Sequence, residues 1–191
     1  MINIVLFGPP GSGKGTQAVK IAEKYDLLHI STGELFRNAI KNETEMGLKA
    51  KAFIVKGNLV PDEVTIGMMN AVINETPNVN GIIFDGFPRT VAQAEALDVF
   101  LNEKKKPVSR MIQLDVSEKE LIARLLNRGK DSGRADDQDT KIIQNRISVY
   151  NEQTLPVANF YEKQDKLTHL KGEGSINVIF DRICSVLDEI V

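Results

Sequence analysis

Short apolar runs recur along the chain, and the first of them, Ile2 to Phe7, is almost continuously hydrophobic. Such runs are typical of strands that are covered on both faces, as in a parallel sheet. Four similar runs follow: Leu27–Ile30, Ile82–Phe84, Met111–Leu114 and Leu167–Leu170. The pattern therefore predicts five buried strands.

Stretches with helical periodicity alternate with these runs. They span Lys14–Tyr25, Val64–Glu75, Val91–Glu103, Lys119–Arg128 and Ile176–Ile190. The last stretch repeats its apolar residues on one helical face, which indicates a helix packed on a core. Strand followed by helix, repeated, predicts an α/β fold in which helices flank a five-stranded parallel sheet through right-handed crossovers.

Two places break the alternation. Residues 31–60 read as helices over 33–41 and 45–56 with no strand between them, so we expect an inserted helical lobe. Residues 127–139 form a glycine- and charge-rich stretch that we expect to be a loop. The following helical pattern, 140–164, must be interrupted or kinked at Pro156.

The composition is that of an ordinary globular protein, with 191 residues, 42% hydrophobic residues and a net charge of -2. This balance argues against a surface that binds nucleic acid or a membrane, and we see no targeting segment or long apolar span. A single cysteine, Cys184, rules out an internal disulfide framework and favours the cytoplasm. Cys184, His29 and His169 lie in apolar patterns, so we expect all three to be buried and structural.

The stretch from Gly8 to Lys14, Gly-Pro-Pro-Gly-Ser-Gly-Lys, satisfies the first seven positions of the P-loop pattern and sits between a predicted strand and a predicted helix. Glycines let backbone N–H groups turn inward around a polyphosphate, and the helix N-terminus adds its positive dipole end. Lys14 supplies a point charge to the outer phosphates. The general motif continues with Ser or Thr, whereas this chain has Gly15 and then Thr16, so a direct hydroxyl ligand for Mg²⁺ is not expected.

The unit GPPGSGKGTQ, together with Ser31–Arg37 (STGELFR) and Asp85–Thr90 (DGFPRT), resembles the adenylate kinases. The resemblance covers the whole chain in order and includes the GKGTQ ending with Gly15. It implies a P-loop NTPase fold and reversible Mg²⁺-dependent transfer of a phosphoryl group from ATP to AMP, giving two ADP. Such proteins are usually monomers.

The resemblance also implies how the single domain is divided. A core comprises 1–30, 61–126 and 138–191, a nucleoside-monophosphate-binding lobe comprises 31–60, and a short lid comprises 127–137. Gly129 and Gly133 flank the lid loop as candidate hinges. The lid lacks the longer insertion and the cysteines of zinc-binding relatives, so no structural zinc is expected.

Site residues follow from the matched motifs. The expected catalytic residues are cations: Lys14, Arg89, Arg128, Arg134 and Arg146. The expected ATP-binding residues are Gly11, Ser12, Gly13, Lys14, Gly15, Thr16, Arg124, Arg128 and Gly174. The expected AMP-binding residues are Thr32, Arg37, Asn58, Leu59, Val60, Gly86, Phe87, Pro88, Arg89, Gln93, Arg134 and Arg146. Asp85, at the end of a strand, is the expected Mg²⁺ residue, acting through bound water.

Three alternatives stay open at this point. Uridylate and cytidylate kinases tend to carry Ala in place of Thr32 and Asn in place of Thr90, so these residues favour AMP over UMP or CMP. A non-catalytic nucleotide-sensing module is the alternative of a different class, although it predicts loss of some arginines. Asp136 and Asp137 either orient the arginines or are solvated acids ahead of a helix capped by Asp139.

Overall fold

The sheet carries five parallel strands in the order β2-β3-β1-β4-β5. The computed structural model describes residues 1–76, 79–132 and 134–190. Its strands are β1 (Ile2–Phe7), β2 (Leu28–Ser31), β3 (Gly81–Asp85), β4 (Arg110–Asp115) and β5 (Leu167–Lys171). The predicted α/β fold with a five-stranded parallel sheet is thus confirmed. Because β1 lies between β3 and β4, the loop after β1 starts where the strand order reverses, which is where open α/β sheets bind ligands.

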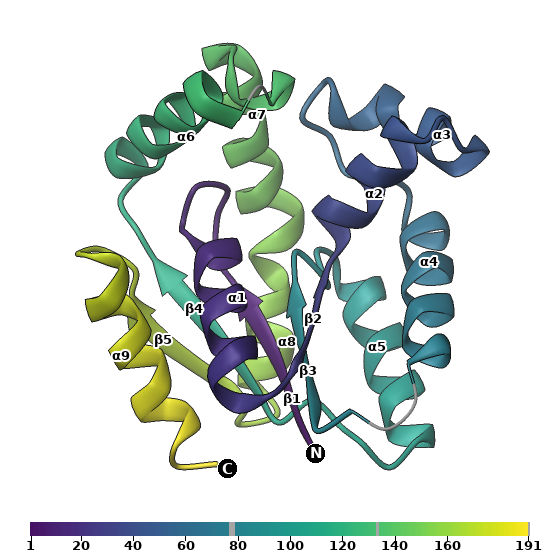
Figure 1. Cartoon of the computed structure of the whole chain (residues 1–191), viewed down its shortest axis with the longest axis vertical. Coiled ribbons are helices and arrows are strands. Elements are labelled where there is room, and N and C mark those ends of the chain that lie inside the picture. Colours follow the sequence, from purple (N-terminus) through teal and green to yellow (C-terminus); the bar gives the residue numbers. More distant parts are fainter. Residues whose placement is uncertain (77–78, 133, 191) are drawn as a thin grey trace.

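Helices cover both faces of the sheet (Figure 1). In β1, Val5 and Phe7 point into one apolar cluster, and Ile4 and Leu6 into the other. The second cluster is closed by α1 (Lys14–Tyr25) and α9 (Ile176–Leu187), and the first by α4 (Asp62–Glu75), α5 (Val91–Glu103) and α8 (Pro156–Glu162). The core therefore holds the C-terminal ends of the strands in fixed positions.

Two further groups of helices stand beyond that end of the sheet, on either side of it (Figure 1). One is formed by α2 (Thr32–Lys41) and α3 (Glu45–Ile54), as the sequence predicts for 31–60. The other is formed by α6 (Glu118–Ser132), a 3₁₀ turn (Ala135–Asp137) and α7 (Thr140–Val149). Among the described residues, no helix has both the length and the apolar character that crossing a bilayer requires.

The loop expected over 127–139 is in part wrong, because α6 continues as a helix to Ser132. The polar residues of this segment face away from the core, so they do not repeat an apolar pattern. The helix expected over 140–164 is interrupted, as predicted, but the interruption is a π-helical turn at Tyr150–Thr154. Pro156 lies in the first turn of α8, where its missing N–H costs no hydrogen bond.

The expectation that both histidines are buried is wrong for His169. Its side chain is 54% exposed, with Nδ1 3.0 Å from Asp115 Oδ2, because β5 is an edge strand of the sheet. His29 is half-buried on β2 and faces Asp85. Cys184 is buried on α9 with a free thiol, as expected.

Candidate active site

A cavity of about 310 Å³ opens at the C-terminal end of the sheet, between the two outer groups of helices. Three carboxylates line it, Glu34, Asp85 and Asp136. The cationic side chains in its wall are twice as many: Lys14, Arg37, Arg89, Arg128, Arg134 and Arg146. Such an excess of positive charge in a partly enclosed cleft favours a polyanionic ligand.

Most residues predicted for the site lie in this wall. Those brought together are Gly11, Gly13, Lys14, Gly15, Thr16, Thr32, Arg37, Asn58, Leu59, Val60, Asp85, Gly86, Phe87, Pro88, Arg89, Gln93, Arg128, Arg134 and Arg146. Three predicted residues, Ser12, Arg124 and Gly174, are not among the residues that line the cavity. Arg124 instead pairs with Glu120 and donates to the carbonyl of Gly172. Gly133, a predicted hinge, lies outside the described residues.

The glycine loop after β1 has the backbone that its sequence predicts. Gly8, Gly11 and Gly13 have φ angles of 141°, 85° and 93°, a backbone region that residues other than glycine rarely adopt. A Cβ on Gly11 would also lie 2.9 Å from Leu125 Cγ and 3.0 Å from the Leu121 carbonyl oxygen. The loop is therefore tightly packed against α6 and holds its turn only with glycine.

Lys14 lies at the start of α1, folded over the loop. Its ammonium donates to the carbonyls of Gly8 and Pro9 at 2.6 and 2.9 Å and to Ser12 Oγ at 3.2 Å. Burial lowers the pKa of Lys14 to about 7, an effect that Asp85 opposes and neighbouring arginines reinforce. Because burial disfavours the charged form of Lys14, a phosphate that replaces the carbonyl partners would stabilise the ammonium.

Arg37 and Arg89 form no ion pair among the described residues, in contrast to the other arginines of the cavity. Arg89 follows β3 and donates from Nε to the Gly86 carbonyl at 2.7 Å, which leaves its terminal nitrogens uncommitted. Burial, with Arg146 nearby, lowers the pKa of Arg89 to about 10, and burial with Arg134 nearby lowers the pKa of Arg37. Two desolvated guanidinium groups that no described carboxylate contacts as an ion pair form a prepared anion site.

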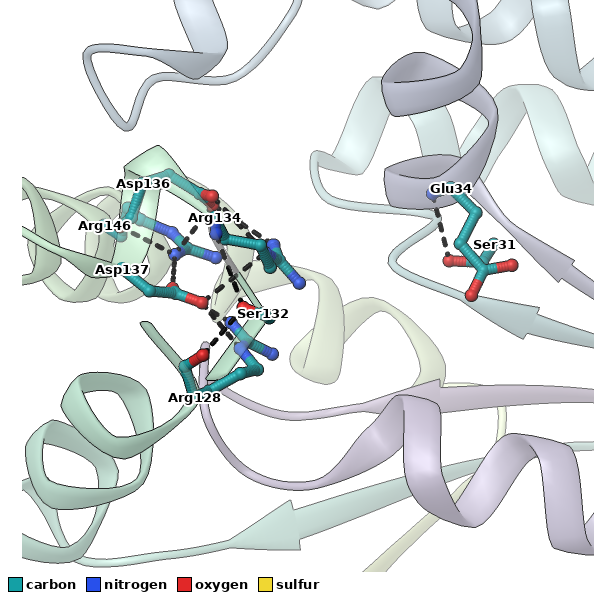
Figure 2. A network of polar contacts seen from close by, with 8 residues as sticks. All are labelled: Ser31, Glu34, Arg128, Ser132, Arg134, Asp136, Asp137 and Arg146. Atoms are coloured by element: carbon teal, nitrogen blue, oxygen red, sulfur yellow. Dashed lines mark hydrogen bonds and ion pairs between the residues drawn. The ribbon is translucent and has the colours of Figure 1, made fainter. Parts of the chain in front are cut away.

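The remaining three arginines are clustered around two aspartates (Figure 2). Asp137 is fully buried and accepts from Arg128 Nε at 2.6 Å, from Arg128 Nη2 at 3.0 Å and from Arg146 Nη1. Asp136 pairs with Arg134 at 3.1 Å and with Arg146 at 2.8 Å. The open alternative for these acids is thereby decided: both orient the arginines, while Asp139 caps α7 by accepting from Lys141 N.

Electrostatics within this cluster keep Asp136 charged. Burial alone would raise the pKa of Asp136, but Arg146 and Arg134 outweigh it and hold the pKa below its usual range. Burial lowers the pKa of Arg146 despite the opposing charges of Asp136 and Asp137. The cluster joins α6 to α7 and presents its arginines to the cavity that also contains Arg37 and Arg89.

Asp85 ends β3 and faces the first turn of α1. Its Oδ2 lies 3.6 Å from His29 Nε2, and a Cβ on Gly15 would lie 3.4 Å from the same oxygen. Burial would raise the pKa of Asp85, but His29, Lys14 and Arg89 together hold it below its usual range. The carboxylate is thus ionised beside the first turn of the glycine-loop helix. The sequence did not predict the contact between His29 and Asp85, because it arises from the pairing of β2 with β3.

Further polar groups of the cavity are fixed by hydrogen bonds. Thr32 Oγ1 donates to the Gly86 carbonyl at 2.7 Å. Gln93, which is 1% exposed, accepts from Arg89 N at 2.8 Å and donates to Asp62 at 2.7 Å. Asp62 was not predicted as a site residue: it lies two residues before the predicted helix 64–75, whereas in the structure it is the first residue of α4.

Comparisons with known proteins agree with this geometry. Residues 6–166 match the family described as Adenylate kinase. An adenylate kinase of Bacteroides fragilis is 50% identical over 188 residues, covering 98% of this chain and 99% of the relative. Adenylate kinases of Flavobacterium psychrophilum and Bacteroides thetaiotaomicron are each 50% identical over 190 residues, covering 100% of both chains. With a parallel sheet whose first strand leads into a P-loop, the chain has the P-loop NTPase fold and belongs to the adenylate kinase family.

Proposed function

We propose that this protein transfers the terminal phosphoryl group of ATP to AMP, reversibly, giving two ADP. The observation that carries this proposal is that the guanidinium groups of Arg37 and Arg89, both desolvated and without an ion-pair partner among the described residues, line the same cavity as the glycine loop with Lys14. A nucleotide hydrolase needs one phosphate-binding centre, whereas a second prepared anion site suits an acceptor that is itself a phosphate. The cavity therefore has a place for each of two phosphorylated ligands.

We assign the glycine loop with Lys14 to the ATP phosphates, and Arg37 with Arg89 to the AMP phosphate. Arg128, Arg134 and Arg146 then lie around the group in transit. We further propose that α2 and α3 form the AMP-binding lobe (31–60) and that 127–137 form the lid. Closure of both groups of helices over the cavity would exclude water, which would otherwise accept the phosphoryl group.

The chemistry asks the protein for positioning and charge. An oxygen of the AMP phosphate attacks the γ-phosphorus of ATP, and the bond from that phosphorus to the β–γ bridging oxygen breaks, so ADP leaves. The attacking oxygen is already ionised, so no general base is needed. What is needed is to hold two polyanions in line and to stabilise the charge that spreads over the transferred group. Arginines fixed by Asp136 and by the buried Asp137 meet that need without reorganising during the reaction.

Members of this family are nucleotide kinases that generally use Mg²⁺ with ATP, and the residues present fit such an ion. Asp85 is an ionised carboxylate beside Gly15 and the phosphate loop. Mg²⁺ prefers oxygen ligands, keeps several waters and is often held by one carboxylate and substrate phosphates. When bound, the ion neutralises charge on the ATP phosphates. We propose that Asp85 holds it through water, with Gly15 leaving the necessary space.

The test is a coupled assay of ADP formation in which ATP is offered AMP, UMP, CMP or GMP. We expect turnover with AMP and little with the other monophosphates, and binding of ATP without turnover would refute the proposal. Arg89→Ala should lower kcat/KM by about 10²–10³, the usual effect of removing one electrostatic group from a transition state. Arg110→Ala is the matched control, since Arg110 contacts the Asp165 carbonyl outside the cavity.

A further inference from the structure

Asp62 lies outside the cavity lining and contacts Gln93, which lines the cavity, and Thr90, which does not. Its Oδ1 accepts from Gln93 Nε2 at 2.7 Å, and its Oδ2 accepts from Thr90 Oγ1 at 2.9 Å. Asp62 itself is not among the residues that line the cavity. Resting on the proposed function, we propose that Asp62 is a positioning residue that sets substrate specificity: it fixes the Gln93 amide in the orientation that selects 6-aminopurines over 6-oxopurines.

The chemistry of its partners determines the orientation of the Gln93 amide. The backbone N–H of Arg89 is a donor, so the group facing it must be the Gln93 oxygen, which lies 2.8 Å away. The carboxylate of Asp62 accepts, so the group facing it must be the Gln93 nitrogen. Inverting the amide would place donor against donor and acceptor against acceptor in a residue that is 1% exposed. Both errors are costly in a buried site.

An amide held in this way has one N–H and one oxygen lone pair left for a ligand in the cavity that Gln93 lines. The 6-amino group of adenine donates and its N1 accepts. In hypoxanthine and guanine the order is reversed, because O6 accepts and N1–H donates. An amide of fixed orientation therefore satisfies one kind of edge and leaves two mismatched pairs with the other, which is the situation in which binding sites discriminate most strongly.

Asp62 also has a structural task that the test must separate from specificity. Thr90 caps α5 by accepting from Gln93 N at 3.2 Å while it donates to Asp62. The carboxylate thus links the N-terminal turns of α4 and α5. A purely structural role predicts equal loss of activity toward every substrate, whereas the positioning role predicts a change in the ratio between substrates.

The experiment compares kcat/KM for AMP with that for IMP, which differs from AMP only in the base at position 6 and N1. In wild-type protein the ratio should favour AMP. Asp62→Ala should lower this ratio about tenfold, since Gln93 keeps only one of the two contacts that fix its orientation. Asp62→Asn should largely restore it, because its side-chain oxygen still accepts from Gln93. In a Gln93→Leu background, Asp62→Ala should leave the ratio unchanged, since its route of action is gone.

Asp98 provides the matched control. It is another half-buried carboxylate that accepts from one hydroxyl, Tyr161 at 3.1 Å, and from one glutamine amide, Gln164 at 2.8 Å, outside the cavity. Asp98→Ala should lower the melting temperature without changing the ratio. An unchanged ratio in Asp62→Ala, an equal change in Asp98→Ala, or a change that persists without Gln93 would each overturn the inference. Absence of turnover of AMP by the wild-type protein would instead refute the proposed function.

Discussion

Replacing Asp137 by Asn tests how the arginine cluster is held. The substitution keeps the shape of the side chain and removes one buried negative charge, to which Arg128, Arg134 and Arg146 are all paired. Removing one partner of a fully buried ion pair typically costs about 3–5 kcal/mol. Here the side chains of Arg128 and Arg134 are 37% and 21% exposed, so water compensates part of the loss, and we expect about 2–3 kcal/mol.

In a domain of this size, such a loss corresponds to a decrease in melting temperature of about 5–10 °C. Asp139→Asn is the matched control, because it lies two residues away and asparagine caps a helix as well as aspartate does. Saturating ATP should raise the melting temperature of Asp137→Asn by more than it raises that of the wild-type protein, since phosphate oxygens replace the missing carboxylate. Thermal melts with and without ATP measure both effects. A wild-type melting temperature, or a smaller shift with ATP, would refute the reasoning.

Three further predictions concern the cavity. Burial lowers the pKa of Lys14 from 10.5 to about 7, so between these pH values the folded protein binds fewer protons than the unfolded chain. The free energy of unfolding should therefore rise with pH over this range, and the rise should be absent in Lys14→Met. For the same reason, ATP binding at pH 8 should take up a proton, which calorimetry in buffers of different ionisation enthalpy detects and Lys14→Met should abolish. Asn145 Nδ2 donates to the Lys56 carbonyl at 2.8 Å and to Asn58 Oδ1 at 3.0 Å. Because Asn58 belongs to the proposed AMP-binding residues, Asn145→Ala should raise the KM for AMP more than the KM for ATP. Replacing its exposed neighbour, Gln144→Ala, should raise neither KM.

Much of the fold could be predicted because the central strands β1, β3 and β4 are buried on both faces and the edge strands still carry short apolar runs. Their apolar runs do not depend on which elements cover them, so four strands were placed to within a residue at either end and β1 was placed in full. The end of α6 could not be placed in this way. Its last turns carry polar residues without an apolar repeat, and Arg128 there contacts Asp137, which joins α6 to the turn before α7.

The site divides along the same line. The glycine loop could be predicted because its backbone requirement is local and only glycine meets it. The sequence offered Asp136 and Asp137 as partners of the arginines but could not decide for them, since an arginine beside an aspartate in sequence is equally compatible with two solvated side chains. Asp62 and Asn145 escaped prediction because their roles arise where helices from different parts of the chain meet. Arg124 was placed by its motif near ATP, but in the structure its nitrogens are taken up by Glu120 and the Gly172 carbonyl.

The distribution of counter-ions gives the two groups of arginines in the cavity different properties. Arg37 and Arg89 have no carboxylate partner among the described residues, so a phosphate that reaches them relieves an existing desolvation cost. Arg128, Arg134 and Arg146 are already paired with Asp136 and Asp137, which offset two of their three positive charges, so a phosphate must share them with carboxylates. If these arginines surround the transferred group as proposed, sharing them with carboxylates keeps their affinity for that group moderate in both ADP and ATP. A reaction that runs in both directions requires such a balance, because a cluster that bound one side much more tightly would hold that product in place.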